Sequence, residues 1–129
     1  MKLEYFENGN AGRPMLLLYG GGTEEVTLLR QALRDVGHGR VRQLAVHNLP
    51  FVESVDNCQL RAVLGPRDIG IVTTAPTDFT WTLDAESWQG TDELLAPFCG
   101  EEPGVPFQYL NPARGPEVLY STGREWQAA

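Results

Sequence analysis

Residues 20–22 are three consecutive glycines between an apolar run and a helix-like segment, a position in which a backbone turn can bind an anion. Such turns bind phosphate when N–H groups at a helix N-terminus converge on it. Glu24 and Glu25 follow directly, and their carboxylates would repel a phosphate. The glycines are contiguous and the chain has a single lysine, so neither G-x-G-x-x-G nor a P-loop is present. We interpret the segment as a strand-to-helix turn with Gly22 or Thr23 as N-cap.

Residues for nucleophilic or metal-assisted catalysis are few. None of the three serines stands in a G-x-S-x-G motif. His38 follows a helix-like segment, where a cation complements the helix C-terminus, and His47 ends a predicted strand. The histidines and the two cysteines, Cys58 and Cys99, lack the close spacing of zinc motifs, and there is no C-x-x-C. We therefore predict no catalytic residue, no metal site and no cofactor.

The net charge of −7 is spread unevenly along the chain. Residues 1–65 hold seven basic and seven acidic groups, whereas residues 66–129 hold three basic and ten acidic groups. Six of these acids fall within residues 84–102. An acidic face disfavours nucleic acid and anionic membranes and attracts basic proteins. The charge pattern therefore predicts a basic protein partner, with no nucleic acid and no membrane.

Aromatic residues of the same half add a second kind of contact. Tyr109 and Tyr120 lie on the two predicted C-terminal strands, where we expect them to be exposed. Exposed tyrosines among carboxylates are typical of protein-binding surfaces, above all for arginine-rich partners. The predicted partner-binding residues are Glu86, Asp92, Glu93, Tyr109 and Tyr120.

Apolar periodicity predicts the elements that position these residues. Val26, Leu29, Leu33 and Val36 predict a helix over residues 23–36. A second helix is predicted over residues 85–96, with Asp84 as its N-cap. Strands 59–64 and 69–74 flank Gly-Pro-Arg-Asp and predict a hairpin. The order of elements predicts one domain, residues 1–129. The predicted fold class is α+β, a mainly antiparallel sheet of about six or seven strands with two helices packed on one face.

The location is predicted from what the chain lacks. The longest strongly apolar run, Met15–Tyr19, is far shorter than the ~20 residues of a membrane helix. The first ten residues are too acidic and polar for a signal peptide. Two free thiols fit a reducing compartment. We predict a cytoplasmic protein.

The C-terminal runs DFTWTLDAESW, LLAPFCG, FQYLN and EVLYSTGREW carry a resemblance to another group of proteins. The pattern resembles one in small bacterial proteins of unknown function, some of which are similar to immunity proteins of contact-dependent or polymorphic toxin systems. The resemblance covers about the last 50 residues of the chain, through aromatic core positions. It implies a cytoplasmic protein that neutralises a toxin by binding it, and it assigns no functional residue.

Three hypotheses follow. The first is a non-enzymatic protein-binding module, an immunity-type inhibitor that binds a basic toxin through its acidic face. The second is a small enzyme or ligand-binding domain with its site at Gly20, Gly21, Gly22 and Thr23, with His47 or Tyr19 nearby. The third is a homodimer that pairs an exposed sheet edge.

Overall fold

The computed structural model describes residues 1–10, 12–100, 106–111 and 114–122. Three of the ten acids counted above in residues 66–129, Glu101, Glu102 and Glu125, lie outside these residues. The described part of the chain forms two α-helices, two 3-10 helices and nine strands. In chain order they are β1 (Lys2–Asn10), β2 (Arg13–Tyr19), α1 (Thr23–Gly37), β3 (Gln43–Ala45), η1 (Val46–Asn48), β4 (Glu53–Ser54), β5 (Gln59–Leu64), β6 (Gly70–Ala75), β7 (Asp78–Leu83), α2 (Ala85–Leu95), η2 (Ala96–Cys99), β8 (Phe107–Asn111) and β9 (Glu117–Ser121).

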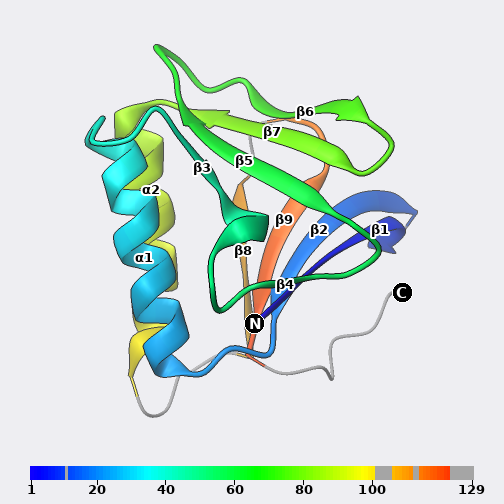
Figure 1. Ribbon diagram of the computed structural model, residues 1–129, viewed down its shortest axis with the longest axis horizontal. Helices are drawn as coiled ribbons and strands as arrows, with labels where there is room; N and C mark the ends of the chain where they lie inside the picture. The colour runs from blue at the N-terminus through cyan, green and yellow to red at the C-terminus, as the bar shows by residue number, and fades with distance from the viewer. Residues whose placement is uncertain (11, 101–105, 112–113, 123–129) are drawn as a thin grey trace.

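The strands form two mixed sheets, and the helices lie side by side at one side of the molecule (Figure 1). The five-stranded sheet has the order β4-β1-β2-β9-β8 and the four-stranded sheet the order β3-β5-β7-β6. Pairs β1–β4, β2–β9 and β5–β7 are parallel, and the other four pairs are antiparallel. The α+β class is therefore confirmed. The prediction of one mainly antiparallel sheet of six or seven strands is corrected to two mixed sheets.

The predicted hairpin of β5 and β6 does not form, because β7 lies between these strands. The connecting segment bonds to the end of β7 and the start of α2 rather than to itself. Gly65 N–H donates to the Leu83 carbonyl at 3.0 Å. The Asp68 carboxylate accepts from Asp84 N–H at 2.9 Å and from the Ser87 hydroxyl at 2.6 Å. These contacts place β7 beside β5, so that the two strands run parallel.

Both helices bury the stripe that their periodicity predicts. Val26, Leu29, Leu33 and Val36 of α1 are at most 2% exposed. Gly22 is the N-cap of α1, and His38 is its C-cap residue. Helix α2 begins after Asp84, whose carboxylate accepts from Ser87 N–H at 2.8 Å. These helix ends were predicted correctly, since caps are local features of the sequence.

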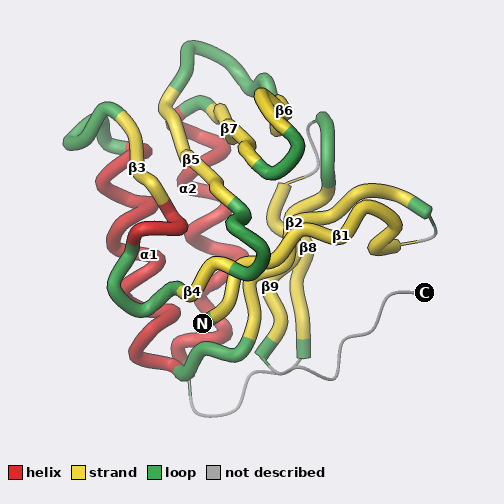
Figure 2. The backbone as a smooth tube through the Cα atoms, turned by 45° about the vertical axis from the view of Figure 1, so that its right-hand side comes forward, coloured by secondary structure: helices red, strands yellow, loops and turns green. Residues whose placement is uncertain are grey.

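One core of buried side chains joins both sheets to both helices. The tube view in Figure 2 shows the arrangement of these elements from a second direction. Three aromatic pairs mark the contacts between layers. Ring centroids lie 4.7 Å apart for Tyr5–Phe79, 4.8 Å for Trp81–Trp88 and 4.9 Å for Phe98–Tyr120. These pairs connect sheet to sheet, sheet to helix, and η2 to sheet, respectively. The helices thus close one side of a space that the two sheets share.

A second apolar cluster lies on the other face of the five-stranded sheet. Met15, Leu17 and Leu119 are at most 3% exposed and pack with Phe6 and Tyr19. Strand β2 is therefore buried on both faces, which explains its continuous apolar run. None of the described helices is long and apolar enough to cross a membrane.

Alanine substitutions at two glycines are expected to change the free energy of unfolding in opposite directions. Gly115 has φ +82°, and a Cβ built there would lie 2.2 Å from the Ile71 carbonyl oxygen. Gly90 lies inside α2, and its Cβ would have no neighbour within 4 Å. We expect Gly115→Ala to lower the free energy of unfolding by more than about 1 kcal/mol and Gly90→Ala to raise it by about 0.5–1 kcal/mol. Urea unfolding curves measure both changes. Equal effects of the two substitutions would contradict the described packing.

Candidate functional site between the two helices

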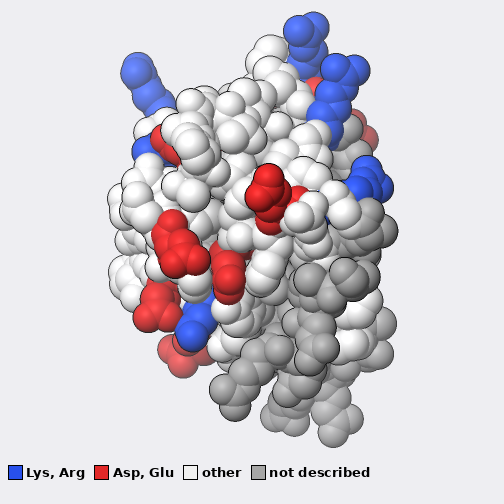
Figure 3. Space-filling model, turned by 90° about the vertical axis from the view of Figure 1, so that its right-hand side faces the viewer, with Lys and Arg blue, Asp and Glu red and all other residues white. Residues whose placement is uncertain are grey.

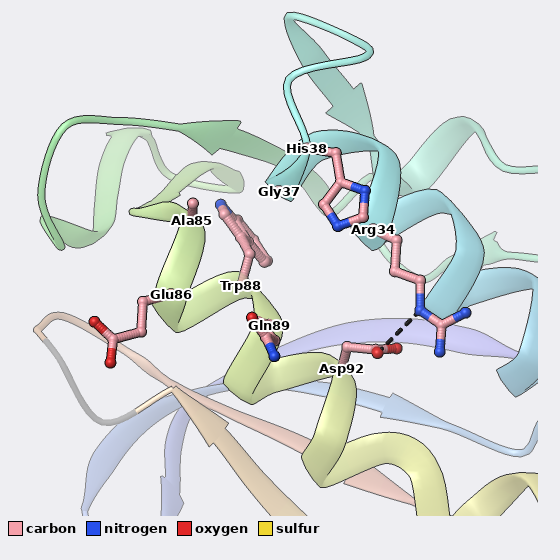
Figure 4. Close-up of a pocket in the computed structure, with 8 residues that line it drawn as sticks. All are labelled: Arg34, Gly37, His38, Ala85, Glu86, Trp88, Gln89 and Asp92. Carbon is pink, nitrogen blue, oxygen red and sulfur yellow. Dashed lines mark hydrogen bonds and ion pairs between the residues drawn. The ribbon is translucent and has the colours of Figure 1, made fainter.

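A groove of about 520 Å³ lies where the C-terminal end of α1 meets the N-terminal end of α2 (Figure 4). Its volume lies in the range of pockets that hold small molecules or single side chains. Its lining from α1 is Arg34, Gly37 and His38, and its lining from α2 is Ala85, Glu86, Trp88, Gln89 and Asp92. The groove therefore has polar, charged and aromatic walls from two different helices.

The helices approach closely at the groove because Gly37 has no side chain. A Cβ at Gly37 would lie 2.9 Å from the Cβ of Trp88. The Trp88 indole is 1% exposed, packs against Trp81, and donates its N–H to the Val63 carbonyl at 3.1 Å. The base of the groove is consequently fixed by contacts to β5 and β7, and the groove is a rigid feature of the core.

At one end of the groove, Asp92 connects the helices by accepting hydrogen bonds from two arginines. Arg30 donates from Nε to Oδ1 at 2.7 Å and from Nη2 to Oδ2 at 3.3 Å. Arg34 donates from Nε to Oδ2 at 3.0 Å. Burial alone would raise the pKa of Asp92, but these hydrogen bonds outweigh it and hold the pKa below its ordinary value of 3.8. Asp92 in turn raises the pKa of Arg30.

The remaining polar groups of the groove are more exposed. The His38 ring points into the space between the helices, and the Arg34 guanidinium is turned toward Asp92 (Figure 4). Glu86 extends outward from α2 on the opposite side of the view from Arg34 (Figure 4). Glu86 has no ion pair or hydrogen bond within the described residues. The groove thus has an anionic end at Glu86 and, at the other end, an ion cluster of two arginines and one aspartate.

The predicted partner-binding residues do not form one surface. Glu86 and Glu93 are exposed on α2. Asp92 is 8% exposed and Tyr120 is 1% exposed, so the expectation that Tyr120 is exposed is wrong, and Asp92 reaches the surface only as part of the groove wall. Tyr120 faces the core, where its hydroxyl donates to the Gly21 carbonyl at 3.2 Å. Burial is the main cause that raises the pKa of Tyr120 to about 12.

Tyr109 is exposed as predicted, but it lies on another side of the molecule. It is 39% exposed, and its register partner on β9 is Leu119, which belongs to the second apolar cluster. Helix α2 instead packs on the main core. The five-stranded sheet therefore separates Tyr109 from the two glutamates, and a single small contact cannot include all three.

Ion pairs between the two halves of the chain offset part of the charge asymmetry seen along the sequence. Arginines of the first half form ion pairs with acids of the second half: Arg13 with Glu117, Arg30 and Arg34 with Asp92, and Arg61 with Asp78. Both signs of charge appear, among much uncharged surface, on the face that Figure 3 shows. These ion pairs give Asp78, Asp92 and Glu117 partners within the chain, so these three acids are not left free to form an acidic face for a partner.

The alternative site at the glycine turn is filled by the chain itself. The Met1 ammonium donates to Glu25 Oε2 at 2.7 Å and to the Phe51 carbonyl at 3.1 Å. A Cβ at Gly21 would lie 2.8 Å from Cε of Met1. Glu25 therefore neutralises a cation of the same chain, and Met1 occupies the space beside Gly21.

The side chains expected near that turn also have other partners. His47 accepts at Nδ1 from Leu60 N–H at 3.0 Å, on β5. The Tyr19 hydroxyl donates to Glu4 at 2.8 Å on the far face of the sheet. None of the described hydrogen bonds joins His47 to residues 20–23. The structure thus does not assemble Gly20, Gly21, Gly22, Thr23 and His47 into one site.

Both cysteines are free thiols. Burial, with the nearby Glu4 as a smaller cause, raises the pKa of Cys58 to about 11. Cys99 is half-buried and lies 3.5 Å from Nη1 of Arg30. Among the described residues, no group of three or more His, Cys, Asp or Glu side chains could hold a metal ion.

Comparison with known proteins gives no relative: no family model, no curated protein and no solved structure matches the chain. The resemblance to toxin-immunity proteins is neither supported nor contradicted by this result and stays a prediction. The assignment of the candidate site consequently rests on the geometry of this chain alone.

Sequence reasoning missed Arg34, Trp88 and Gln89 as parts of one groove and Arg30 as a partner of Asp92, and it assigned His38 only to the end of a helix. The spacing of Arg30 and Arg34 places them on one side of α1, which was a usable signal. Their partner Asp92 lies 62 and 58 positions away. A pairing of this range is set by the packing of the helices and has no local signature.

The ion cluster of Asp92 with Arg30 and Arg34 leads us to expect that the stability of the protein depends on pH. Because the folded pKa of Asp92 is lowered, its contribution to stability is present above the unfolded pKa and is lost as pH falls through the folded pKa. We expect Asp92→Asn to lower the free energy of unfolding by about 1–3 kcal/mol at neutral pH. The difference from wild type should shrink below pH 3.8.

Urea unfolding at the two pH values measures this difference. Glu93→Gln, one position along α2 and exposed, is the control and should change stability by less than about 0.5 kcal/mol. A difference between Asp92→Asn and wild type that stays constant across the pH range would show that Asp92 does not act through its charge.

Proposed function

We propose that this protein is a non-enzymatic protein-binding module that docks a basic partner on the exposed side of α2, as an immunity-type inhibitor of a toxin would. The proposal rests on the difference in ion pairing and exposure among the acidic residues of α2. Asp92 is neutralised by two arginines, whereas Glu86 and Glu93 are exposed and have no ion pair within the described residues. Spaced seven residues apart, they lie on one side of the helix.

The described hydrogen bonds favour binding over catalysis. They join no serine or cysteine to a histidine, as nucleophile activation would require. Ser87 donates to Asp68 and belongs to the start of α2. His47 uses Nδ1 on the backbone of Leu60. The serine and histidine side chains in the most site-like positions thus stabilise the fold. The carboxylates of Glu86 and Glu93 have no ion pair within the described residues, although Glu93 accepts a hydrogen bond from Gln89 at 3.4 Å, and they are left for a partner.

A partner with lysines or arginines would be attracted to Glu86 and Glu93 before contact. Exposed charges of this kind raise association rates and make binding sensitive to salt, because ions screen them. Tight binding of a nuclease-like toxin would additionally cover its active site. The free thiols Cys58 and Cys99 support the cytoplasm as the place of action.

Charge reversal tests this proposal. We expect Glu86→Lys with Glu93→Lys to abolish capture of the basic proteins that wild type retains from a lysate of the native host. The matched control is Glu7→Lys with Glu24→Lys, which makes the same change in net charge at two exposed acids elsewhere. Quantitative mass spectrometry of the retained proteins measures the effect. Identical retention by both double variants would contradict a role for α2.

A second candidate function, self-association, is favoured by a different observation. Phe107 and Tyr109 of β8 are each 39% exposed, and their rings meet edge to face at 6.1 Å and 90°. Strand β8 is the last strand of the five-stranded sheet. Adjacent exposed aromatic side chains are typical of protein interfaces. The pair would form the centre of a contact between two copies of the chain.

Analytical ultracentrifugation tests self-association. If the aromatic pair forms the contact, wild type should sediment faster as its concentration rises, and Phe107→Ser with Tyr109→Ser should sediment as a monomer throughout. Leu28→Ser, which changes a single apolar residue 49% exposed on α1, is the control and should behave as wild type. Sedimentation as a monomer by wild type at all concentrations would exclude the homodimer.

A further inference from the structure

We propose that the groove between α1 and α2 is the pocket in which the partner inserts one anchor side chain, a flat apolar or aromatic group beside a basic group. The inference rests on the proposed function and assigns the pocket that the partner uses. Hot spots of protein interfaces are single large side chains held in a pocket that already exists in the free protein. The groove meets this description through its shape and its charge.

The shape of the groove suits a flat group. The Ala85 side chain is a single methyl group, which leaves space between the end of α1 and the first turn of α2, beside the contact of Gly37 with Trp88. The His38 ring points into this space from α1, and the Trp88 indole borders it from α2 (Figure 4). Trp88 is buried and held by Val63 and Trp81, so it fixes the floor of the groove from within the core. Little ordering of the pocket is needed, which favours binding.

The charges of the groove orient the occupant. Glu86 at one end has no cation within the described residues. At the other end, Arg34 and Arg30 carry one positive charge more than Asp92 balances. A basic group would therefore be attracted to Glu86 and repelled from the Arg34 end. The partial negative charge at the C-terminal end of α1 and the partial positive charge at the N-terminal end of α2 oppose each other here, so the carboxylate of Glu86 is the charge that favours a cation.

Benzamidine is a suitable probe, because it is an aromatic ring bearing a cationic amidinium group. Its neutral isostere benzamide and its anionic counterpart benzoate keep the ring and change only the charge. We expect benzamidine at millimolar concentration to shift the backbone amide resonances of Gly37, His38, Trp88 and Gln89 in ¹⁵N spectra of the full chain. Benzamide should bind several-fold more weakly, and benzoate should leave these resonances unchanged.

Three variants sharpen the assignment. Glu86→Gln should reduce benzamidine binding to the level of benzamide, because the orienting carboxylate is lost. Ala85→Leu should abolish binding by filling the groove, and its spectrum should otherwise keep the wild-type dispersion because residue 85 is exposed. Glu24→Gln, in the first turn of α1 at the opposite end of that helix, is the charge control and should bind benzamidine as wild type does.

The inference is overturned if none of the three compounds shifts these resonances. It is equally overturned if benzoate binds as well as benzamidine, or if Glu86→Gln binds benzamidine as wild type does. These outcomes are separate from the test of the proposed function. Suppose that the Glu86/Glu93 charge reversal abolishes partner capture but benzamidine does not bind the groove. The groove would then not be the pocket for the partner, and the proposed protein-binding function would stand.

Discussion

The carboxylate of Asp92, held between Arg30 and Arg34, is the interaction that joins the two helices of this protein. It lies beside the closest approach of the helices, where Gly37 meets Trp88. A buried carboxylate is stable there because three N–H groups donate to it, and the removal of either arginine would leave part of its charge without a partner. The contact also closes one end of the groove, so that the same residues that stabilise the helix pair define the candidate site.

The ion pairs of the fold also change what the uneven distribution of charge along the sequence implies for a partner. Acids of the second half of the chain form ion pairs with four arginines of the first half, in which basic and acidic residues are equal in number: Arg13, Arg30, Arg34 and Arg61. What remains on α2 is a smaller and more specific feature, two exposed glutamates at and beyond the rim of a groove. A partner would therefore recognise a local arrangement of charges rather than a uniformly acidic protein.

Local features of the fold could be predicted from the sequence, and long-range pairings could not. The stripe from Val26 to Val36 and the cap at Asp84 determine the two helices, because their signals lie within a few residues. The position of β7 between β5 and β6 accompanies hydrogen bonds from Asp84 and Ser87 to Asp68, contacts over 16 and 19 positions that no local pattern reveals. The same limit applies to the site. Glu86, Glu93 and Tyr109 are exposed as predicted, whereas Asp92 and Tyr120 are buried by neighbours distant in sequence.

The central claim, that a partner docks on the α1–α2 side of the molecule, is tested most directly by hydrogen–deuterium exchange. Exchange of the protein alone is compared with exchange in complex with the captured partner. The account predicts slower exchange, on complex formation, in peptides that cover the C-terminal turn of α1 and the whole of α2, with little change in β8 and β9. Protection confined to β8 and β9, with the helices unchanged, would contradict it.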